Sequence, residues 1–376
     1  MEPYAGDFIM RHAEAVAIYH EVEVIHLVRD KAGSVTKRVL EETCTRGRLT
    51  ERIIYYHSPT LFPASADRFL SWLVYRRWCR RSLKAYMQRK GLPAGVHVHV
   101  AGKNGWMALW LKRKFGLPFV LTEHWTIYLP EAKPDFRSLS LPAKWLWRRI
   151  VRQAAGISAV SQYLGNAMLG WQSGLRFSVI PNVVDTRLFF PAPVDKHPFH
   201  FIHISGLDYQ KNPEDILRAI GLLKQAGFMG RLSVFGPRRP DLLQMAVSLG
   251  LQDRVSFCSE VPQVELANHI RQADALILYS RYETFGCVLI EANACGIPVI
   301  VSDIPVHRET VQEGINGYFA AGESAVALAQ KLQWFMQLAK PGDKEQIAAQ
   351  AREKYSYERV GRMFDAFYAA HLGKGV

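Results

Sequence analysis

Short, uninterrupted apolar runs recur along the chain and alternate with stretches of helical pattern. An apolar run without polar alternation is typical of a strand buried on both faces of a parallel sheet. Strands separated in this way by helices indicate repeated βα units and hence an α/β fold with parallel sheets. The pattern predicts strands at Val22–Val28, Ile53–Tyr56, Val96–Val100, Phe119–Thr122, Gly156–Val160, Phe199–Ser205, Leu232–Gly236, Val255–Cys258, Ala275–Tyr279, Val299–Val301 and Gly317–Phe319.

The clearest unit of this kind begins with the apolar run Ala275–Tyr279. A loop follows this run, and the good helix formers Cys287–Cys295 come next. Gly296 stands where a left-handed residue ends a helix, and Pro298 prevents the helix from continuing. A strand–loop–helix unit points the free N–H groups and the positive dipole end of its helix beyond the carboxyl edge of the sheet. That position suits an anion such as a diphosphate.

Two carboxylates, Glu283 and Glu291, flank the start of this helix, with Phe285 and Gly286 between them. Glutamates eight positions apart also occur as an exposed loop residue and an exposed helix residue in many proteins. Together with SRYETFG before and ACGIPVIVSD after, however, the pair resembles the retaining glycosyltransferases of family four. That family has the GT-B fold, two Rossmann-like domains facing across a cleft, and uses nucleotide-diphosphate sugars. The resemblance implies that Glu283 contacts the donor sugar, that Glu291 contacts the ribose, and that Thr284, Phe285 and Gly286 also bind the donor.

Three further segments carry the same resemblance. In GLDYQKNP, Lys211 matches the family's diphosphate-binding Lys, whereas Gly206 takes the place of its Arg. In VFGPRR, Gly236 belongs to the donor-binding loop, and in TEHW the resemblance places His124 near the donor sugar. We therefore expect His124, Glu283 and Lys211 to be catalytic and Gly206 and Gly236 to line the donor site. Other cations could replace the missing Arg, and the candidates are Arg238, Arg239 and Arg281.

The N-terminal stretch GDFIMRHAEAVA resembles the first loop and helix of the GT-B fold, but no strand precedes it. We expect the N-terminal sheet to lack its first strand, which would expose two strand edges because that strand is usually internal. Met1 would then be a late start. The resemblance places Gly6 and His12 on the acceptor side.

A chain of 376 residues has room for two separate cores. The resemblance implies an acceptor domain at 1–185, a linker at 186–198, a donor domain at 199–355 and a C-terminal helix at 356–376 that returns to the first domain. The segment PNVVD ends the first domain, and three prolines mark the linker, namely Pro191, Pro193 and Pro198.

The positive charge is confined to the first half of the chain. Residues 1–190 hold 28 Lys and Arg against 14 Asp and Glu, and residues 191–376 hold 19 against 20, so +14 and −1 sum to the net +13. A basic half suggests an anionic partner, either nucleic acid or an anionic membrane, although such residues also simply keep a surface soluble. No helix-turn-helix, zinc or RNP pattern supports specific nucleic-acid binding.

Two predicted helices, Ser65–Lys90 and Ala143–Gln153, mix Trp with Arg as interfacial helices do. Ordinary core packing of the Trp residues explains the pattern equally well. We predict a peripheral contact with an anionic membrane through Arg76, Arg77, Arg80, Arg81 and neighbouring aromatics. No apolar run is long enough to span a membrane. Five scattered cysteines form no paired motif, which favours a reducing cytoplasm. Together with the expected membrane contact, we predict a location at the inner face of the plasma membrane.

The sequence therefore predicts a retaining, metal-independent glycosyltransferase that acts on a glycan or lipid-linked acceptor, as in the synthesis of cell-surface polysaccharide. It would need no cofactor besides the nucleotide-sugar co-substrate. We interpret His97 and His99 in VHVHV as packing residues rather than metal ligands, because no third ligand accompanies them. Two alternatives stay open, a nucleotide-sugar 2-epimerase of the same fold and a non-catalytic sugar-binding or scaffold protein.

Overall fold

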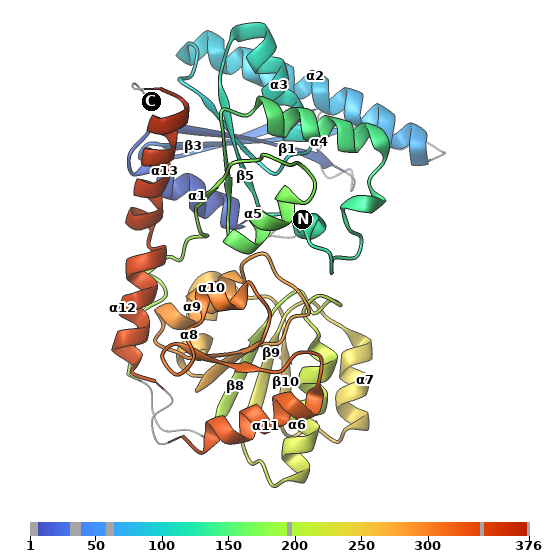
Figure 1. Ribbon diagram of the computed structural model, residues 1–376, viewed down its shortest axis with the longest axis vertical. Coiled ribbons are helices and arrows are strands. Elements are labelled where there is room, and N and C mark those ends of the chain that lie inside the picture. The colour runs from blue at the N-terminus through green and yellow to red at the C-terminus, as the bar shows by residue number, and fades with distance from the viewer. Residues whose placement is uncertain (1–6, 31–38, 58–63, 194–197, 339–341, 374–376) are drawn as a thin grey trace.

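A computed structural model describes residues 7–30, 39–57, 64–193, 198–338 and 342–373. Two α/β domains lie one above the other in Figure 1, and the last two helices run along one side of both. Each domain has a parallel sheet with helices packed against it. Among the described residues, no helix is long and apolar enough to cross a membrane.

The first domain contains two separate sheets. One has the order β1-β3-β2, and in it β1 is parallel to β3 whereas β2 is antiparallel. The other has the order β4-β5-β6-β7 and is parallel throughout. The strands of this domain are β1 (Val22–Asp30), β2 (Val39–Arg46), β3 (Leu49–His57), β4 (Val96–His99), β5 (Phe119–Glu123), β6 (Gly156–Ala159) and β7 (Ser178–Val179).

The gap between the two sheets agrees with the predicted absence of a first strand. Within the described ranges, no strand pairs with the open edges of β1 and β4. Gly6, which the sequence places at the opening of the first helix, lies outside the described residues. The helices of this domain are α1 (Asp7–Ala17), α2 (Ala64–Lys90), α3 (Lys103–Phe115), α4 (Leu141–Gln153) and α5 (Gln162–Leu169), with short 3-10 turns at Thr126–Tyr128 and Phe136–Ser138.

The second domain has one six-stranded parallel sheet in the order β10-β9-β8-β11-β12-β13. Its strands are β8 (His200–Ile204), β9 (Arg231–Phe235), β10 (Val255–Cys258), β11 (Ala275–Leu278), β12 (Val299–Ser302) and β13 (Gly317–Ala320). The strand order reverses direction between β8 and β11. In open α/β sheets, ligands bind beyond the carboxyl ends of the strands at such a switch point.

The helices of the second domain connect its parallel strands and continue into the C-terminal pair. They are α6 (Pro213–Gln225), α7 (Pro240–Ser248), α8 (Gln263–Arg271), α9 (Cys287–Ala294), α10 (His307–Thr310), α11 (Ala325–Met336), α12 (Lys344–Tyr355) and α13 (Tyr357–His371). Gly296, predicted to end α9, has φ +74°, and a Cβ there would lie 2.7 Å from the carbonyl oxygen of Lys344. Glycine is therefore required at this position, where α12 packs closely.

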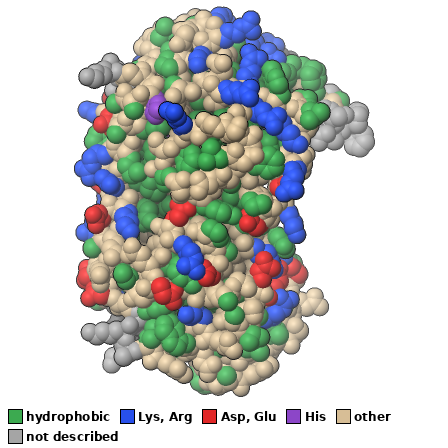
Figure 2. Space-filling view, in the orientation of Figure 1, with side chains coloured by type: hydrophobic (Ala, Val, Ile, Leu, Met, Phe, Trp, Pro, Cys, Tyr) green, Lys and Arg blue, Asp and Glu red, His purple; other side chains and the backbone are tan. Residues whose placement is uncertain are grey.

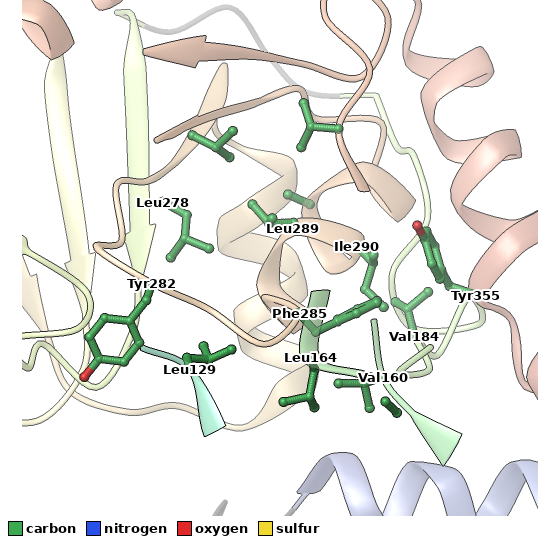
Figure 3. Packing of buried hydrophobic residues seen from close by; sticks show 14 of the residues in the cluster. Leu129, Val160, Leu164, Val184, Leu278, Tyr282, Phe285, Leu289, Ile290 and Tyr355 are labelled. Carbon is green, nitrogen blue, oxygen red and sulfur yellow. The ribbon is translucent and has the colours of Figure 1, made fainter. Parts of the chain in front are cut away.

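Apolar side chains from both domains meet in one cluster. Leu129, Val160 and Leu164 of the first domain belong to it, as do Phe285 and Ile290 of the second. Figure 3 shows Phe285 at the centre of this contact. Because the cluster is continuous, the loop before α9 is held against the first domain by the hydrophobic effect.

The last helix, α13, lies against α1 of the first domain. Its Phe364 shares a buried cluster with Ala15 and Val16. The Tyr357 hydroxyl donates a hydrogen bond to Glu14 at 2.7 Å. The chain thus ends on the domain in which it begins (Figure 1).

Candidate functional site

The switch point brings together Lys211, from the loop after β8, and Glu283, from the loop after β11. The Lys211 Nζ donates to Glu283 Oε1 in an ion pair. Ser280 Oγ donates to the same oxygen at 2.9 Å, and Gln210 Nε2 donates to the other oxygen at 3.2 Å. Glu283 is only 4% exposed, so these donors replace the water that an ionised carboxylate requires.

Helix α9 starts immediately after this loop, at the N-cap residue Gly286. Its φ is +85°, in the left-handed region, and a Cβ would lie 3.1 Å from Leu289 Cδ1. This turn aims the first backbone N–H groups of α9 away from the sheet, where they can bind an anion. Across the domain interface, Ser161 Oγ donates to the Thr284 carbonyl oxygen at 2.7 Å. Thr284, Phe285 and Gly286 therefore form the wall of the second domain that faces the first.

Glu291, in the second turn of α9, pairs with Arg11 of α1 across the interface. Arg11 Nη1 donates to Glu291 Oε1 at 2.7 Å, and Nη2 donates to Gln263 at 2.9 Å and pairs with Asp7 at 2.7 Å. Burial lowers the pKa of the Arg11 guanidinium, but the Glu291 and Asp7 carboxylates outweigh it and raise the pKa above its ordinary value. Sequence reasoning missed Arg11. The available signal was an Arg four residues after Asp7, on the same predicted helix as His12.

Histidines line the first domain near α1. His124 follows β5, its ring centroid lies 5.3 Å from that of His12, and Phe8 packs on it at 4.7 Å. His124 Nε2 is 3.0 Å from His99 Nδ1. Burial lowers the pKa of His12 to about 4 and holds the pKa values of His99 and His124 well below the ordinary value. These imidazoles are therefore neutral at physiological pH.

The expectation that His97 and His99 lack a third companion is only half right. Both nitrogens of His97 are occupied, with the Tyr368 hydroxyl at 2.7 Å and Thr122 Oγ1 at 2.7 Å, as suits a packing residue. His99, however, is joined by His12 and His124, and one nitrogen of each ring lies within 4.8 Å of the others. Sequence reasoning treated the VHVHV strand alone and could not see that α1 and the end of β5 meet there.

Glu123, the last residue of β5, is fully buried. Its Oε1 accepts hydrogen bonds from the Ala101 backbone N–H at 2.7 Å and from the Tyr128 hydroxyl at 2.8 Å. Oε2 has no hydrogen-bond partner in the part of the chain that the structure describes. Burial raises the pKa of Glu123 to about 7. This carboxyl group therefore titrates near neutral pH immediately before His124.

Both domains match known protein families. The sequence model described as Glycosyltransferase Family 4 matches residues 10–188, and the one described as Glycosyl transferases group 1 matches residues 184–354. The chain belongs to glycosyltransferase family 4. Members of this family are retaining glycosyltransferases, as the motifs around Glu283 and Lys211 predict.

Curated relatives of this family-4 chain include two enzymes with different acceptors. A D-inositol 3-phosphate glycosyltransferase from Streptosporangium roseum is 28% identical over 286 residues, which are 68% of this chain and 64% of that protein. An N-acetyl-alpha-D-glucosaminyl L-malate synthase from Bacillus anthracis is 26% identical over 279 residues, 70% of each chain. The first match thus spans somewhat less than two thirds of the relative's length.

Solved structures confirm the GT-B prediction for the family-4 chain. A sucrose-phosphate synthase from Thermosynechococcus elongatus aligns with a TM-score of 0.76 at 19% identity, covering 97% of this chain and 92% of the other. The Anabaena protein HepE, solved in complex with UDP and glucose, aligns with a TM-score of 0.70 at 17% identity, covering 97% and 96%. At these identities the likeness establishes the shared fold.

The position where the family has Arg is open in this chain. A Cβ on Gly206 would meet only Asp208 Oδ2, at 3.9 Å, so the backbone here leaves space beside the switch point. Gly236 differs, since a Cβ there would lie 2.4 Å from the Ser205 carbonyl oxygen. Gly236 therefore lets β9 pass close to the loop that carries Lys211.

The three cations proposed as substitutes for that Arg differ from one another in their contacts. Arg239 donates to the Leu207 carbonyl oxygen and pairs with Asp241 at 2.6 Å. Arg281 donates to the Tyr209 carbonyl oxygen at 2.5 Å and lies over the Tyr209 ring. Arg238 is exposed. Arg11, by contrast, already reaches Glu291 from the other domain, so it is a fourth candidate that the sequence did not indicate.

Proposed function

We propose that this chain transfers a sugar, with retention of anomeric configuration, from a nucleotide-diphosphate sugar to a glycan or lipid-linked acceptor. The observation that carries the proposal is the Lys211–Glu283 ion pair at the switch point, beside the N-terminus of α9. It places a cation, free N–H groups and a buried carboxylate in one small region. The cation and the N–H groups suit the diphosphate of the donor, and the buried carboxylate suits a sugar ring with several hydroxyls.

In this proposal, the donor exchanges partners with the residues of the ion pair. The diphosphate takes the Lys211 ammonium, and the hydroxyls of the sugar donate to the Glu283 carboxylate. As the bond between the anomeric carbon and the phosphate oxygen breaks, negative charge grows on the diphosphate. Lys211 and the N–H groups after Gly286 stabilise that charge. The departing phosphate accepts the proton of the acceptor hydroxyl as the new glycosidic bond forms.

The ribose hydroxyls of the donor would bind Glu291, whose carboxylate Arg11 already orients from the other domain. Arg11 would then reach the nucleotide only indirectly, through the Glu291 carboxylate. We propose that it contributes positive potential that the glycine at position 206 cannot supply. His124, Gly236 and the segment Thr284–Gly286 remain proposed donor contacts, and His12 stays on the acceptor side of the proposal.

The outer face of α2 is the proposed contact with an anionic membrane. A groove of about 770 Å³ along this helix is lined by five cations, Arg76, Arg77, Arg80, Arg81 and Lys84. Figure 2 shows Lys and Arg side chains gathered over the part of the surface where α2 lies in Figure 1. A lipid-linked acceptor would be presented at such a surface. We propose that the protein works at the inner face of the plasma membrane, in cell-surface polysaccharide synthesis.

Three cations of this groove lie over tryptophan rings, among them Arg81, whose guanidinium is 5.3 Å from the Trp78 ring centroid. The Arg76 guanidinium lies 4.5 Å from the Trp72 ring centroid and 4.3 Å from that of Trp106. Arg80 lies 5.1 Å from Trp106 and 5.0 Å from Trp110. Stacking on aromatic rings fixes the guanidinium groups while leaving their N–H groups available for phosphate oxygens.

The decisive experiment measures ligand-induced stabilisation with a panel of UDP-, GDP- and ADP-sugars, followed by product analysis. A sugar nucleotide that binds the native state raises the melting temperature. With that donor, we expect slow hydrolysis to nucleoside diphosphate and free sugar, without added divalent metal, and faster turnover when an acceptor is present. An epimerised nucleotide sugar from donor alone would instead establish a 2-epimerase. No stabilisation by any donor would overturn the proposal in favour of a non-catalytic protein.

A further inference from the structure

The N-terminus of α5 lies at the interface between the domains, and the second domain supplies part of its cap. Figure 1 shows α5 at the lower edge of the first domain and α10 at the upper edge of the second. The backbone N–H groups of Gln162 and Tyr163 donate to the two carboxylate oxygens of Glu309, at 2.7 Å and 2.6 Å. Glu309 belongs to α10, so a carboxylate from the other domain takes the first two N–H groups of α5.

The third N–H group of α5 is capped from within the first domain. Ser161, the N-cap residue, accepts a hydrogen bond from the Leu164 N–H at 3.1 Å. The following N–H, that of Gly165, donates to the Ser161 carbonyl oxygen at 3.1 Å and begins the regular helical pattern. Every N–H group of the first turn therefore has a partner while Glu309 is in place. Separation of the domains would leave two of them to water.

A carboxylate is well suited to this position. The helix dipole places positive potential at the N-terminus of α5, and a hydrogen bond from an N–H group to an ionised carboxylate is stronger than one between neutral groups. Each oxygen of Glu309 takes a separate N–H group, so the contact also fixes the orientation of α5 relative to α10.

The cap residue of α5 also holds the loop that carries Glu283. The Ser161 hydroxyl donates its one proton to the Thr284 carbonyl oxygen at 2.7 Å, while its oxygen accepts from Leu164. Ser161 is only 2% exposed, so water does not compete for these contacts. In the same loop, Phe285 shares the buried interdomain cluster with Leu164, and Figure 3 shows the two side by side. Helix α5 therefore fixes the backbone immediately after Glu283.

Helix α10 is tied to the same loop from inside the second domain. His307 is fully buried, and its Nδ1 donates to the Ser302 carbonyl oxygen at 2.9 Å. Ser302 Oγ donates to the Ser280 carbonyl oxygen at 2.6 Å, and Ser280 Oγ donates to Glu283 Oε1 at 2.9 Å. Glu309 and Glu283 thus belong to one connected set of residues. The contact that caps α5 from α10 therefore also brings the α5 cap residue to the loop.

We propose that Glu309 and Ser161 are positioning residues of the transfer reaction. Glu309 favours the closed arrangement of the domains by capping α5, and Ser161 then fixes the loop beside Glu283. The inference rests on the sugar transfer proposed above, because it gives both residues a part in placing Glu283 against the donor sugar. Neither residue touches the reacting atoms. Loss of either should therefore slow the reaction more than it weakens nucleotide binding.

The first test is kinetic and uses the full-length protein. Glu309→Gln replaces one acceptor oxygen by an NH₂ group, which cannot accept from an N–H, and Ser161→Ala removes the hydroxyl that donates to Thr284. With the donor found by the panel above, each variant should lower kcat about 10-fold, as one lost hydrogen bond and a displaced loop predict. The dissociation constant of UDP, GDP or ADP, measured by calorimetry, should stay within about twofold of wild type.

The double variant of Glu309→Gln and Ser161→Ala distinguishes a shared role from two separate ones. Because both residues act through α5, the double variant should lower kcat little more than either single variant does. Independent effects would instead multiply to about 100-fold, and that result would overturn the shared role.

Two controls reproduce these contacts away from the interface. Glu313 also accepts from a backbone N–H, that of Phe319 at 2.8 Å, but within the second domain. Ser324 caps α11 by accepting from the Ala327 N–H at 3.2 Å. Glu313→Gln and Ser324→Ala lose the same kinds of hydrogen bond and should leave kcat within about twofold of wild type. An equal loss of kcat in the controls, or wild-type kcat in Glu309→Gln or Ser161→Ala, would overturn the inference.

Small-angle X-ray scattering of the protein without nucleotide tests the interdomain contact apart from the chemistry. The radius of gyration should be larger for Glu309→Gln than for wild type or Glu313→Gln, because the domains lose a contact that holds them together. Equal radii would overturn the role of Glu309 in closure. If wild type turned over no sugar nucleotide, the proposed transfer would fail, and the scattering result would still decide whether Glu309 joins the domains.

Discussion

At the scale of single residues, both acids of the proposed donor site are already paired with cations. Glu283 is paired with Lys211 inside the second domain, and Glu291 is paired with Arg11 across the interface. The pattern around α9 allowed Glu283, Glu291 and Gly286 to be singled out from sequence, because they lie within one strand–loop–helix unit. Arg11 could not be found in this way. Its partner is 280 positions distant, and only the docking of two domains brings them together.

Substitutions at the donor site should separate binding from catalysis. Glu283→Ala should lower kcat by about 100-fold with a smaller effect on nucleotide binding, because the sugar it holds changes charge in the transition state. Lys211→Ala should lower both kcat and donor affinity, since Gly206 provides no second cation. Glu291→Ala should mainly raise the donor KM, by about 10-fold, because the ribose is remote from the breaking bond. Steady-state kinetics with the donor identified above measures all three.

The exposed pair of Glu265 and His269 supplies a control for these substitutions. Glu265→Ala removes a carboxylate from the same domain and should leave kcat and the donor KM within about twofold of their wild-type values. The assignments would be reversed if Glu291→Ala abolished turnover in folded protein while Glu283→Ala left it intact.

Glu123 should make stability depend on pH. Its folded pKa of about 7 lies above the ordinary value of 4.5 because burial disfavours the charged form. The stabilisation is complete below about pH 4.5 and is lost as the pH rises through 7. Relative to Glu123→Gln, which cannot ionise, wild-type protein should lose on the order of 3 kcal/mol over this interval.

Urea unfolding of wild type and Glu123→Gln at pH 5, 6, 7 and 8 measures this difference. Parallel curves for the two proteins would mean that Glu123 is already ionised throughout, and would contradict the raised pKa. Asp253 is exposed and its pKa is lowered, so it titrates below this pH range. Asp253→Asn is therefore a control whose difference in stability from wild type should not change with pH.

At the scale of elements, buried strands were predictable and exposed ones were not. All six strands of the second domain lie within or next to apolar runs, because a parallel strand covered on both faces has no polar alternation. β2 was missed, since its sequence VLEETCTR is exposed at seven of eight positions and carries no apolar run. It forms because the turn at Gly47, with φ +58°, pairs Arg46 with Leu49.

Helix α2 combines a packed side with an outer side of exposed cations. Arg76 and Arg80 are half-buried over tryptophan rings, whereas Arg77, Arg81 and Lys84 are exposed, with the Arg81 guanidinium over Trp78. The triple variant Arg77→Gln, Arg81→Gln, Lys84→Gln should weaken binding to vesicles containing anionic lipid by about 100-fold, at roughly 1 kcal/mol for each cation. Co-sedimentation with vesicles of defined anionic content measures the effect, which should diminish as salt increases.

A control of equal charge is available in the second domain. Arg218, Lys224 and Lys331 each have an acidic partner, so their triple Gln variant changes net charge by the same amount without touching α2. Equal losses in the two triple variants would show that only net charge matters. Vesicle binding that does not depend on the anionic lipid content would contradict the proposed membrane contact.

At the scale of the whole molecule, the Arg11–Glu291 pair is a buried polar contact between the domains. Arg11 is 7% exposed and Glu291 is 5% exposed. Arg11→Met leaves the Glu291 carboxylate buried without its cation and should cost about 3–5 kcal/mol of stability, whereas Glu291→Met should cost less, because Asp7 still pairs with Arg11. The double variant should cost clearly less than the sum. Urea unfolding of the four proteins in this cycle gives the coupling energy, and additivity within about 0.5 kcal/mol would show that the pair is not coupled.

The return of α13 to α1 has a consequence for biosynthesis. Residues 357–371 are translated after the whole second domain, yet they supply Val360 and Phe364 to the cluster that encloses Ala15 and Val16. On the ribosome, the second domain can complete its own sheet as soon as β13 has emerged. Helix α1 of the first domain stays uncovered until α13 has left the exit tunnel. The first domain can complete this part of its core only then.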